Sequence, residues 1–341
     1  MFCLKAAVFC LKGSAMRFFK ASFLAAVLSL GMATVASAET EVKIGYALAE
    51  NSHYGVAAKA WADAVEKATD GKFKFRQFPS SALGGEREMV EGLQLGTIEA
   101  TIVSTGTLSN FVPAVGVTDI PFLFRDLNHA RDVLDGPIGR DLLAQFEPRG
   151  LVALAWGEQG FRHITNNRHP INTPADLAGL KLRTMENPVH ITAFETLGAA
   201  PTPMAWPEVI GALQQGTIDG QENPLSVIVS AKLYEVQKYL TLSGHVYSPA
   251  VLLVSKPFYD GLSDEEKEAF RKGAAEGVVA MRAFVDDVEK SGVEQLKEKG
   301  MQVNELSAEQ KADFQNSLKA AYEQYYRKYD EKLIDDIIAT K

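Results

Sequence analysis

An arginine and two Glu-Asn-Pro triplets mark places where a strand-like run meets a helical pattern. The triplets are residues 186–188 and 222–224, and Arg183 precedes the first of them. Proline suits the first position of a helix, and asparagine suits the cap before it. The free N–H groups and the dipole of a helix N-terminus favour anions, and an arginine offers a planar fork for a carboxylate. We therefore expect half of an anion-binding cleft here, although a surface salt bridge would also explain Arg183.

Five further side chains are candidates for a ligand site, and each has a plainer explanation. Arg162, in Gln-Gly-Phe-Arg-His, binds the ligand or is a solvated loop arginine. Asn223 binds it or only caps a helix. Trp206 offers an aromatic face for a sugar ring or packs in the core. Glu86 contacts ligand hydroxyls or only complements a helix dipole. His53 is a ligand group or a surface residue.

The chain lacks the sequence signatures of the common catalytic sites. It has no G-x-S-x-G, H-E-x-x-H, P-loop or G-x-G-x-x-G motif. Its six histidines show no metal-ligand spacing. We expect binding without chemistry, and neither a cofactor nor a metal. An enzyme stays open as an alternative, since catalytic residues can lie far apart in sequence.

The first 38 residues have the pattern of a secretory signal peptide. A basic start from Met16 is followed by an apolar run and by Ala36-Ser37-Ala38 as a cleavage site, so residues 1–15 are expected to precede the true start. Residues 39–341 keep 31 of the 35 Lys and Arg, all 43 Asp and Glu, and no cysteine. Their net charge of −12 disfavours nucleic acid as a partner, and the absence of cysteine excludes disulfides. We expect a periplasmic protein.

The hydrophobic pattern predicts an α/β fold in two related domains. Strands and helices alternate from residue 42 to 103, which indicates a parallel sheet. The run 88–99 matches 208–219 at an offset of 120, with six identical positions. The order of helix, glycine and strand is the same in both copies. Either this is a generic unit or the two domains share a topology, and we favour the second.

The second half of the chain contains the predicted connections between the domains. Strands are expected at 151–156, 236–242 and 250–255, with a crossover at 161–164. A capping box at Ser263 opens a proline-free stretch of about 35 residues, which as one helix would span roughly 50 Å. It is one helix across both domains or two helices split near Gly292. A single amphipathic helix is expected at the C-terminal end.

Several runs resemble the substrate-binding proteins of TRAP transporters, of the dicarboxylate type. They are Leu-Arg-x-x-x-Asn-Pro, Pro-Thr-Pro-Met-Ala-Trp-Pro-Glu-Val and Gly-Thr-Ile-Asp-Gly-Gln-Glu-Asn-Pro, and the resemblance covers nearly all of 42–335. By this resemblance Arg183 pairs with the ligand carboxylate, and Arg162, Asn223, Trp206 and Glu86 also take ligand-binding positions. This sequence departs from the sialic-acid binders of the family at three positions. It has Ser104 and Thr107 where the sialic-acid binders carry an acid and an arginine, and Glu186 where they carry asparagine.

The resemblance implies a two-lobed periplasmic binding-protein fold with crossing strands and a long helix spanning both lobes. We expect lobe I to be residues 39–161 plus 249–290, and lobe II to be 162–248 plus 291–341. The implied function is capture of an organic acid, a uronate or related sugar acid, and its delivery to TRAP membrane subunits. A C4-dicarboxylate or another small carboxylate is the alternative ligand. We expect a monomer whose ligand site includes Arg183, Arg162, Asn223, Trp206, Glu86, Glu186, Ser104 and His53.

Overall fold

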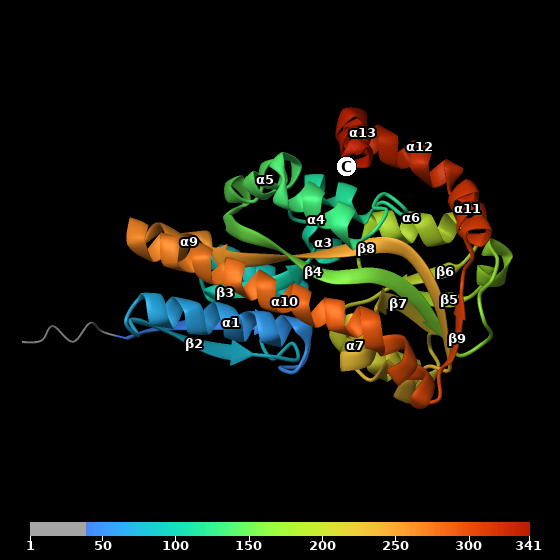
Figure 1. Cartoon of the computed structure of the whole chain (residues 1–341), viewed down its shortest axis with the longest axis horizontal. Coiled ribbons are helices and arrows are strands. Elements are labelled where there is room, and N and C mark those ends of the chain that lie inside the picture. Colours follow the sequence, from blue (N-terminus) through green and yellow to red (C-terminus); the bar gives the residue numbers. More distant parts are fainter. Residues whose placement is uncertain (1–38) are drawn as a thin grey trace, which may run out of the picture. The chain divides into compact units, whose positions relative to one another are not determined.

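A mixed nine-stranded sheet organises the computed structural model, which describes residues 39–341 (Figure 1). The predicted signal peptide lies outside the described residues. The strand order is β2-β1-β3-β8-β4-β7-β5-β6, with β9 beside β8. β1 pairs in parallel with β2 and β3, and β5 pairs in parallel with β6 and β7. The strands are β1 Thr40–Tyr46, β2 Phe73–Phe78, β3 Ala100–Ser104, β4 Leu151–Asn166, β5 Lys181–Thr184, β6 Ala200–Pro203, β7 Gly220–Pro224, β8 Tyr239–Ser255 and β9 Gln302–Glu305.

Two long antiparallel strands, β4 and β8, join the β1–β3 end of the sheet to the β5–β7 end. β4 has 16 residues and β8 has 17, and they pair from Leu151–Ser255 to Asn166–Tyr239. The predicted crossing strands are therefore confirmed, but their predicted ends were wrong. Pro249 and the residues before it continue β8 because the ladder with β4 holds the backbone extended. The register shifts at Glu158/Gly160 and Arg162/Ile164, close to the predicted crossover.

The long helix α10, Asp264–Glu298, is continuous and lies along both ends of the sheet (Figure 1). Ser263 and Glu266 form the predicted capping box at its start. Gly273 and Gly277 let α10 approach α1, His53–Ala68; a Cβ at Gly273 would lie 2.8 Å from a ring atom of Trp61. Glycine has a low helix propensity, but here it allows two helices to pack closely. The alternative of two helices split near Gly292 is wrong.

The sequence repeat corresponds to two equivalent helix–strand units. α2, Glu86–Leu95, leads into β3, and α7, Trp206–Gln215, leads into β7. The glycine after each helix has a left-handed backbone conformation, with φ 72° at Gly96 and 67° at Gly216. Its N–H caps the last turn of the helix in both cases. The offset of 120 makes Glu86 and Trp206 equivalent first residues of their helices.

The remaining helices cover the sheet or connect its strands. The prediction of a single terminal helix is wrong, because the structure has three helices there: α11 Ala308–Ser317, α12 Lys319–Lys328 and α13 Glu331–Ala339. Arg125 and His129, at the start of α4, contact carbonyls at the end of α13. The others are α3 Thr105–Leu108, α4 Leu127–Asp135, α5 Pro137–Ala144, α6 Pro188–Thr196, α8 Leu225–Ser230 and α9 Lys256–Asp260, with short 3-10 turns η1 Pro113–Asp119, η2 Glu147–Arg149, η3 Pro174–Leu177 and η4 Leu233–Glu235.

Candidate functional site

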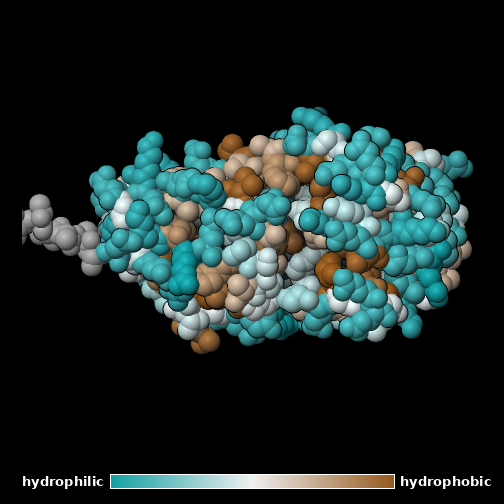
Figure 2. Space-filling view, turned by 90° about the horizontal axis from the view of Figure 1, so that it is seen from below, coloured by the Kyte–Doolittle hydropathy of each residue, from teal (hydrophilic) through white to brown (hydrophobic). Residues whose placement is uncertain are grey.

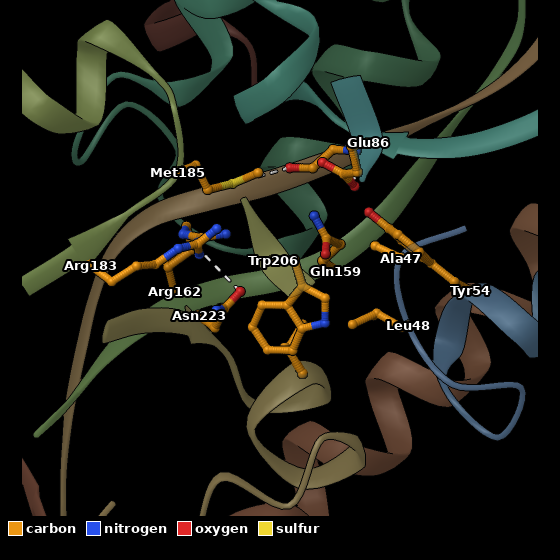
Figure 3. Close-up of a pocket in the computed structure, with 12 residues that line it drawn as sticks. Ala47, Leu48, Tyr54, Glu86, Gln159, Arg162, Arg183, Met185, Trp206 and Asn223 are labelled. Carbon is orange, nitrogen blue, oxygen red and sulfur yellow. Dashed lines mark hydrogen bonds between the residues drawn. The ribbon is translucent and has the colours of Figure 1, made fainter. Parts of the chain in front are cut away.

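A small cavity lies where the two ends of the sheet face each other (Figure 3). It opens beside a second hollow that shares Ala47, Leu48 and Trp206 with it. Seen from below, the molecule shows a narrow hollow between two largely hydrophilic halves (Figure 2). Strand ends and helix starts from both halves line the cavity: Ala47, Leu48, Tyr54, Glu86, Ser104, Gln159, Arg162, Arg183, Met185, Trp206, Asn223 and Val227.

Arg183 enters the cavity from β5 without a carboxylate partner among residues 39–341. Its Nε and Nη2 donate to the Met204 carbonyl at 3.0 and 2.7 Å, and its guanidinium carbon lies 5.9 Å from the centre of the Trp206 ring. Burial lowers the pKa of Arg183 to about 10, so the group stays cationic at neutral pH. Its side chain is 3 % exposed, which excludes the surface salt bridge as an explanation.

Arg162, by contrast, already has its carboxylate. Its Nε and Nη2 both donate to the carboxylate of Glu222 on the neighbouring strand β7, with Nη2 at 2.8 Å. Nη1 donates to Ser248 at 3.1 Å. Burial alone would raise the pKa of Glu222, but Arg162 outweighs it and holds that pKa well below its usual range. Arg162 is 1 % exposed, so the solvated-loop explanation is wrong.

A buried polar network continues from this ion pair behind the cavity. Glu222 also faces His245 Nε2 at 3.3 Å and His190 Nδ1 at 3.8 Å. His190 Nε2 lies 3.9 Å from Asp119, whose carboxylate accepts hydrogen bonds from Thr105 and Asn187. Burial raises the pKa of Asp119 to about 7 and lowers that of His190 to about 3. The network holds Arg162 in place from the side away from the cavity.

Asn223 and Ser104 line the cavity at the ends of equivalent strands. Asn223 accepts from Arg162 Nη2 at 3.4 Å and donates to Gln221. It does not cap α8, because Pro224 occupies the cap position. Ser104 caps the short helix α3, and its hydroxyl lies 3.6 Å from the Met185 sulfur, a contact between the two halves. Glu86 and Trp206 begin α2 and α7, and both line the cavity.

Two of the predicted site residues, His53 and Glu186, do not line the cavity. Glu186 follows Met185 at the end of β5, so its side chain has the opposite parity and Met185 lines the cavity instead. Side chains alternate between the two faces of a strand, so counting two residues on from Arg183 would have selected Met185 as a cavity residue. His53 is fully buried against Tyr54 and Phe284, at ring distances of 4.7 and 6.1 Å, so it is not a surface residue either.

Sequence reasoning missed Tyr54 and Gln159 as cavity residues. Tyr54 is the second residue of α1, after the cap Ser52. Gln159 comes just before Gly160, whose φ of 104° suits glycine, and its Nε2 donates to Ser248 at 3.0 Å. A signal for Tyr54 existed: Glu86 and Trp206 also lie in the first turn of a helix that follows a strand.

Replacing His53 with phenylalanine is expected to reduce the acid sensitivity of the fold. Burial lowers the pKa of His53 to about 3, and the nearby side chain of Gln159 only partly opposes this shift. The unfolded chain takes up this proton below its pKa of about 6.5, whereas the folded chain does not. The neutral ring therefore supports folding at high pH, and this support is lost as the pH falls from about 6.5 towards 3.

We expect His53→Phe to keep or raise the free energy of unfolding at pH 7. Its slope between pH 6 and 4 should be shallower than that of the wild type by up to about 1.4 kcal/mol per pH unit, the value for one proton. Urea unfolding at several pH values measures this. His169→Phe, at an exposed loop position, is the matched control. Equal slopes for His53→Phe and wild type would contradict the prediction.

Residues 39–341 contain no cluster of three or more His, Cys, Asp or Glu arranged to hold a metal ion. In the same part of the chain, no helix has the length and apolarity needed to cross a bilayer. The groups that line the cavity are one unpaired arginine, one paired arginine, the Glu86 carboxylate, the rings of Trp206 and Tyr54, and several hydroxyl and amide groups. Such a set can bind a small anion that also carries hydroxyl groups.

Comparison with known proteins agrees with this geometry. The model of "Bacterial extracellular solute-binding protein, family 7" matches residues 44–329. A TRAP periplasmic solute-binding protein from Bordetella, with density interpreted as pantoate, is 60% identical with a TM-score of 0.87, covering 89% of this chain and 100% of the other. One from Polaromonas bound to D-erythronate is 51% identical with a TM-score of 0.87, covering 89% and 99%.

Among sequence relatives, the 2,3-diketo-L-gulonate-binding periplasmic protein of Escherichia coli is 38% identical over 283 residues, which is 83% of this chain and 86% of that protein. The fold of these relatives is the predicted two-lobed one. The resemblance seen in the sequence over nearly all of 42–335 is confirmed, since the family model covers residues 44–329. This protein belongs to the bacterial extracellular solute-binding protein family 7, the solute-binding proteins of TRAP transporters.

Proposed function

We propose that this protein captures a small sugar acid in the periplasm, with Arg183 binding the ligand carboxylate, and delivers it to TRAP membrane subunits. One observation supports this most strongly. Arg183 is a buried cation in a cavity, and no carboxylate of residues 39–341 pairs with it. A buried charge without a partner is costly. A ligand carboxylate would supply that partner, while Asn223 and Arg162 would lie beside it.

The rest of the lining favours a hydroxylated ligand. The cavity is small, and Glu86, Tyr54, Gln159 and Ser104 offer hydrogen bonds beyond the arginines. Trp206 offers an aromatic face, which suits the C–H side of a sugar acid. The three similar proteins named above have density interpreted as pantoate, bound D-erythronate, and 2,3-diketo-L-gulonate in the protein's name, and all three compounds are hydroxy or keto monoacids. Glu186 and His53 are not part of this proposed site.

We also propose that the two halves of the sheet are separate lobes that close on the ligand. The hydrogen bonds Asn187–Asp119 at 2.8 Å and Asn110–Glu186 carbonyl at 2.7 Å join the halves near the cavity. They belong to a closed arrangement and would break on opening. β4 at Gly160 and β8 near Ser248, where the ladder is irregular, would provide the hinge.

Small-angle scattering is expected to show a smaller radius of gyration with ligand than without it. The physical reason is that closure removes the solvent-filled gap between the lobes. The same data give the molecular mass, and a monomer is expected. An unchanged radius of gyration at a ligand concentration that saturates calorimetric binding would contradict the closure.

The proposed function is tested by thermal unfolding with a panel of acids. We suggest D-erythronate, pantoate, D-galactonate, D-glucuronate and succinate, with erythritol as the uncharged control. An acid at a hundredfold excess over its Kd should stabilise the fold by roughly 2.7 kcal/mol. Stabilisation by none of the acids, or equally by erythritol, would contradict the proposal. Consumption of any acid, followed by NMR, would favour the enzyme alternative.

A further inference from the structure

Tyr54 carries a buried hydroxyl group that the protein itself leaves without a partner. The residue is 1 % exposed and lines the cavity, and its Oη makes no hydrogen bond to any of residues 39–341. Its position in the first turn of α1 is fixed by the Ser52 cap and by the core behind the helix. A buried hydroxyl without a partner destabilises the folded protein. An unpaired donor that faces a ligand cavity points to a ligand group.

Glu86 lies close to Tyr54 and is held rigidly. Its Oε1 accepts from the Ser104 N–H at 3.0 Å and its Oε2 accepts from the Thr107 hydroxyl at 2.6 Å. Burial raises the pKa of Glu86, while these two hydrogen bonds and the positive charges of Arg183 and Arg162 oppose that shift. Each oxygen keeps a lone pair for a further donor. Burial raises the pKa of Tyr54 well above its usual value, and the charge of Glu86 adds to this effect. The phenol therefore keeps its proton and can donate.

The two groups occupy the end of the cavity opposite the arginines. In Figure 3, Arg162 and Arg183 lie at one end, and Tyr54, Glu86 and Ala47 lie at the other. Arg183 and Trp206 come from the β5–β7 side of the sheet, and Tyr54 and Glu86 come from the β1–β3 side. A ligand whose carboxylate binds Arg183 would present its far end to Tyr54 and Glu86.

Building on the proposed function, we infer that Tyr54 and Glu86 recognise a hydroxyl group at the far end of the acid and reject a second carboxylate there. A hydroxyl can accept from the Tyr54 O–H and donate its own proton to Glu86, so both protein groups gain a partner. A carboxylate can accept from Tyr54 but has no proton for Glu86, and the two negative charges would repel. The site thereby selects aldonates over the matching dicarboxylates.

Calorimetry with matched acids tests this inference. D-erythronate and meso-tartrate have the same carbon skeleton and differ in a terminal CH₂OH or carboxylate, and D-galactonate and galactarate form the six-carbon pair. The comparison is made with the pair that contains the more tightly bound aldonate. We expect the wild type to bind that aldonate at least about tenfold more tightly than its dicarboxylate, and Glu86→Gln to reduce this preference about tenfold or more, since like-charge repulsion is removed.

Tyr54→Phe separates recognition from structure. It should weaken binding of the aldonate about tenfold, because a buried hydrogen bond is lost. It should leave unchanged the affinity for the analogue without the terminal hydroxyl, which for erythronate is 2,3-dihydroxybutanoate. Glu88→Gln on the exposed side of α2 and Tyr326→Phe on α12 are the matched controls, and both should bind as wild type does.

Three results have distinct meanings. If the wild type binds the dicarboxylate as tightly as the aldonate, the inference is wrong while the proposed function stands. If Tyr54→Phe weakens the hydroxyl-free analogue as much as the aldonate, Tyr54 acts through the fold and the inference is again wrong. If the wild type binds none of the acids, the proposed function itself fails.

Discussion

Arg183→Ala should bind its acid ligand at least about 30-fold more weakly than the wild type. In the proposed complex the guanidinium pairs with the ligand carboxylate in a cavity that is mostly shielded from water. Loss of one partner from such a pair costs roughly 2–5 kcal/mol, and each 1.4 kcal/mol is a factor of ten in Kd. Among residues 39–341, the hydrogen bonds lost are those to the Met204 carbonyl, together with the contact to the Trp206 ring. The free energy of unfolding should therefore change little.

Arg183→Lys should also bind poorly, because lysine keeps the charge but cannot form the two parallel hydrogen bonds of a guanidinium. Calorimetry on both variants, beside a melting curve for each, measures the two effects separately. Arg168→Ala, an exposed arginine on the surface, is the control. Wild-type affinity in both Arg183 variants would place the carboxylate elsewhere in the cavity. Lost affinity together with a collapsed melting temperature would make Arg183 a structural residue.

Glu222→Ala should lower the free energy of unfolding by about 3–5 kcal/mol, the usual effect of breaking a buried ion pair. Glu222 is fully buried and pairs with Arg162, which is 1 % exposed. Without Glu222 the Arg162 charge would remain buried with only Ser248, Asn223 and a carbonyl group as partners. Glu222→Gln keeps the shape of the side chain and one acceptor, so its free energy of unfolding should fall less. The control Glu91→Gln, on the exposed side of α2, should have the free energy of unfolding of the wild type.

The pH dependence gives a second measurement of the same pair. Arg162 depresses the pKa of Glu222 in the folded chain. A depressed carboxylate contributes stability that is fully present above its unfolded pKa of about 4.5 and is lost as the pH falls through the folded pKa. The difference in unfolding free energy between wild type and Glu222→Gln, measured in urea, should therefore be constant above pH 5 and shrink below about pH 4.5. A difference that does not change with pH would mean that the pair is not ionised.

Local features of the sequence determined much of this protein. The bounds of α2 follow from glycines before and after a helical pattern, and α10 starts at its predicted capping box. Arg183 was found because Pro188 and Asn187 mark a helix start beside a strand end, and the structure places both as the first residue and the cap of α6. Such signals depend on neighbours within a few residues, so they can be read from one sequence. The family resemblance rests on the same short runs.

Pairing between distant segments decided the rest. β4 and β8 are single long strands only because each forms a ladder with the other along its whole length. Arg162 meets Glu222 because β4 and β7 pair side by side, 60 residues apart in sequence. His53 and Tyr54 are neighbours at the start of α1, yet one points into the core and the other lines the cavity. That choice depends on the rotation of the helix against α10 and the sheet, and this packing is a property of the tertiary structure alone.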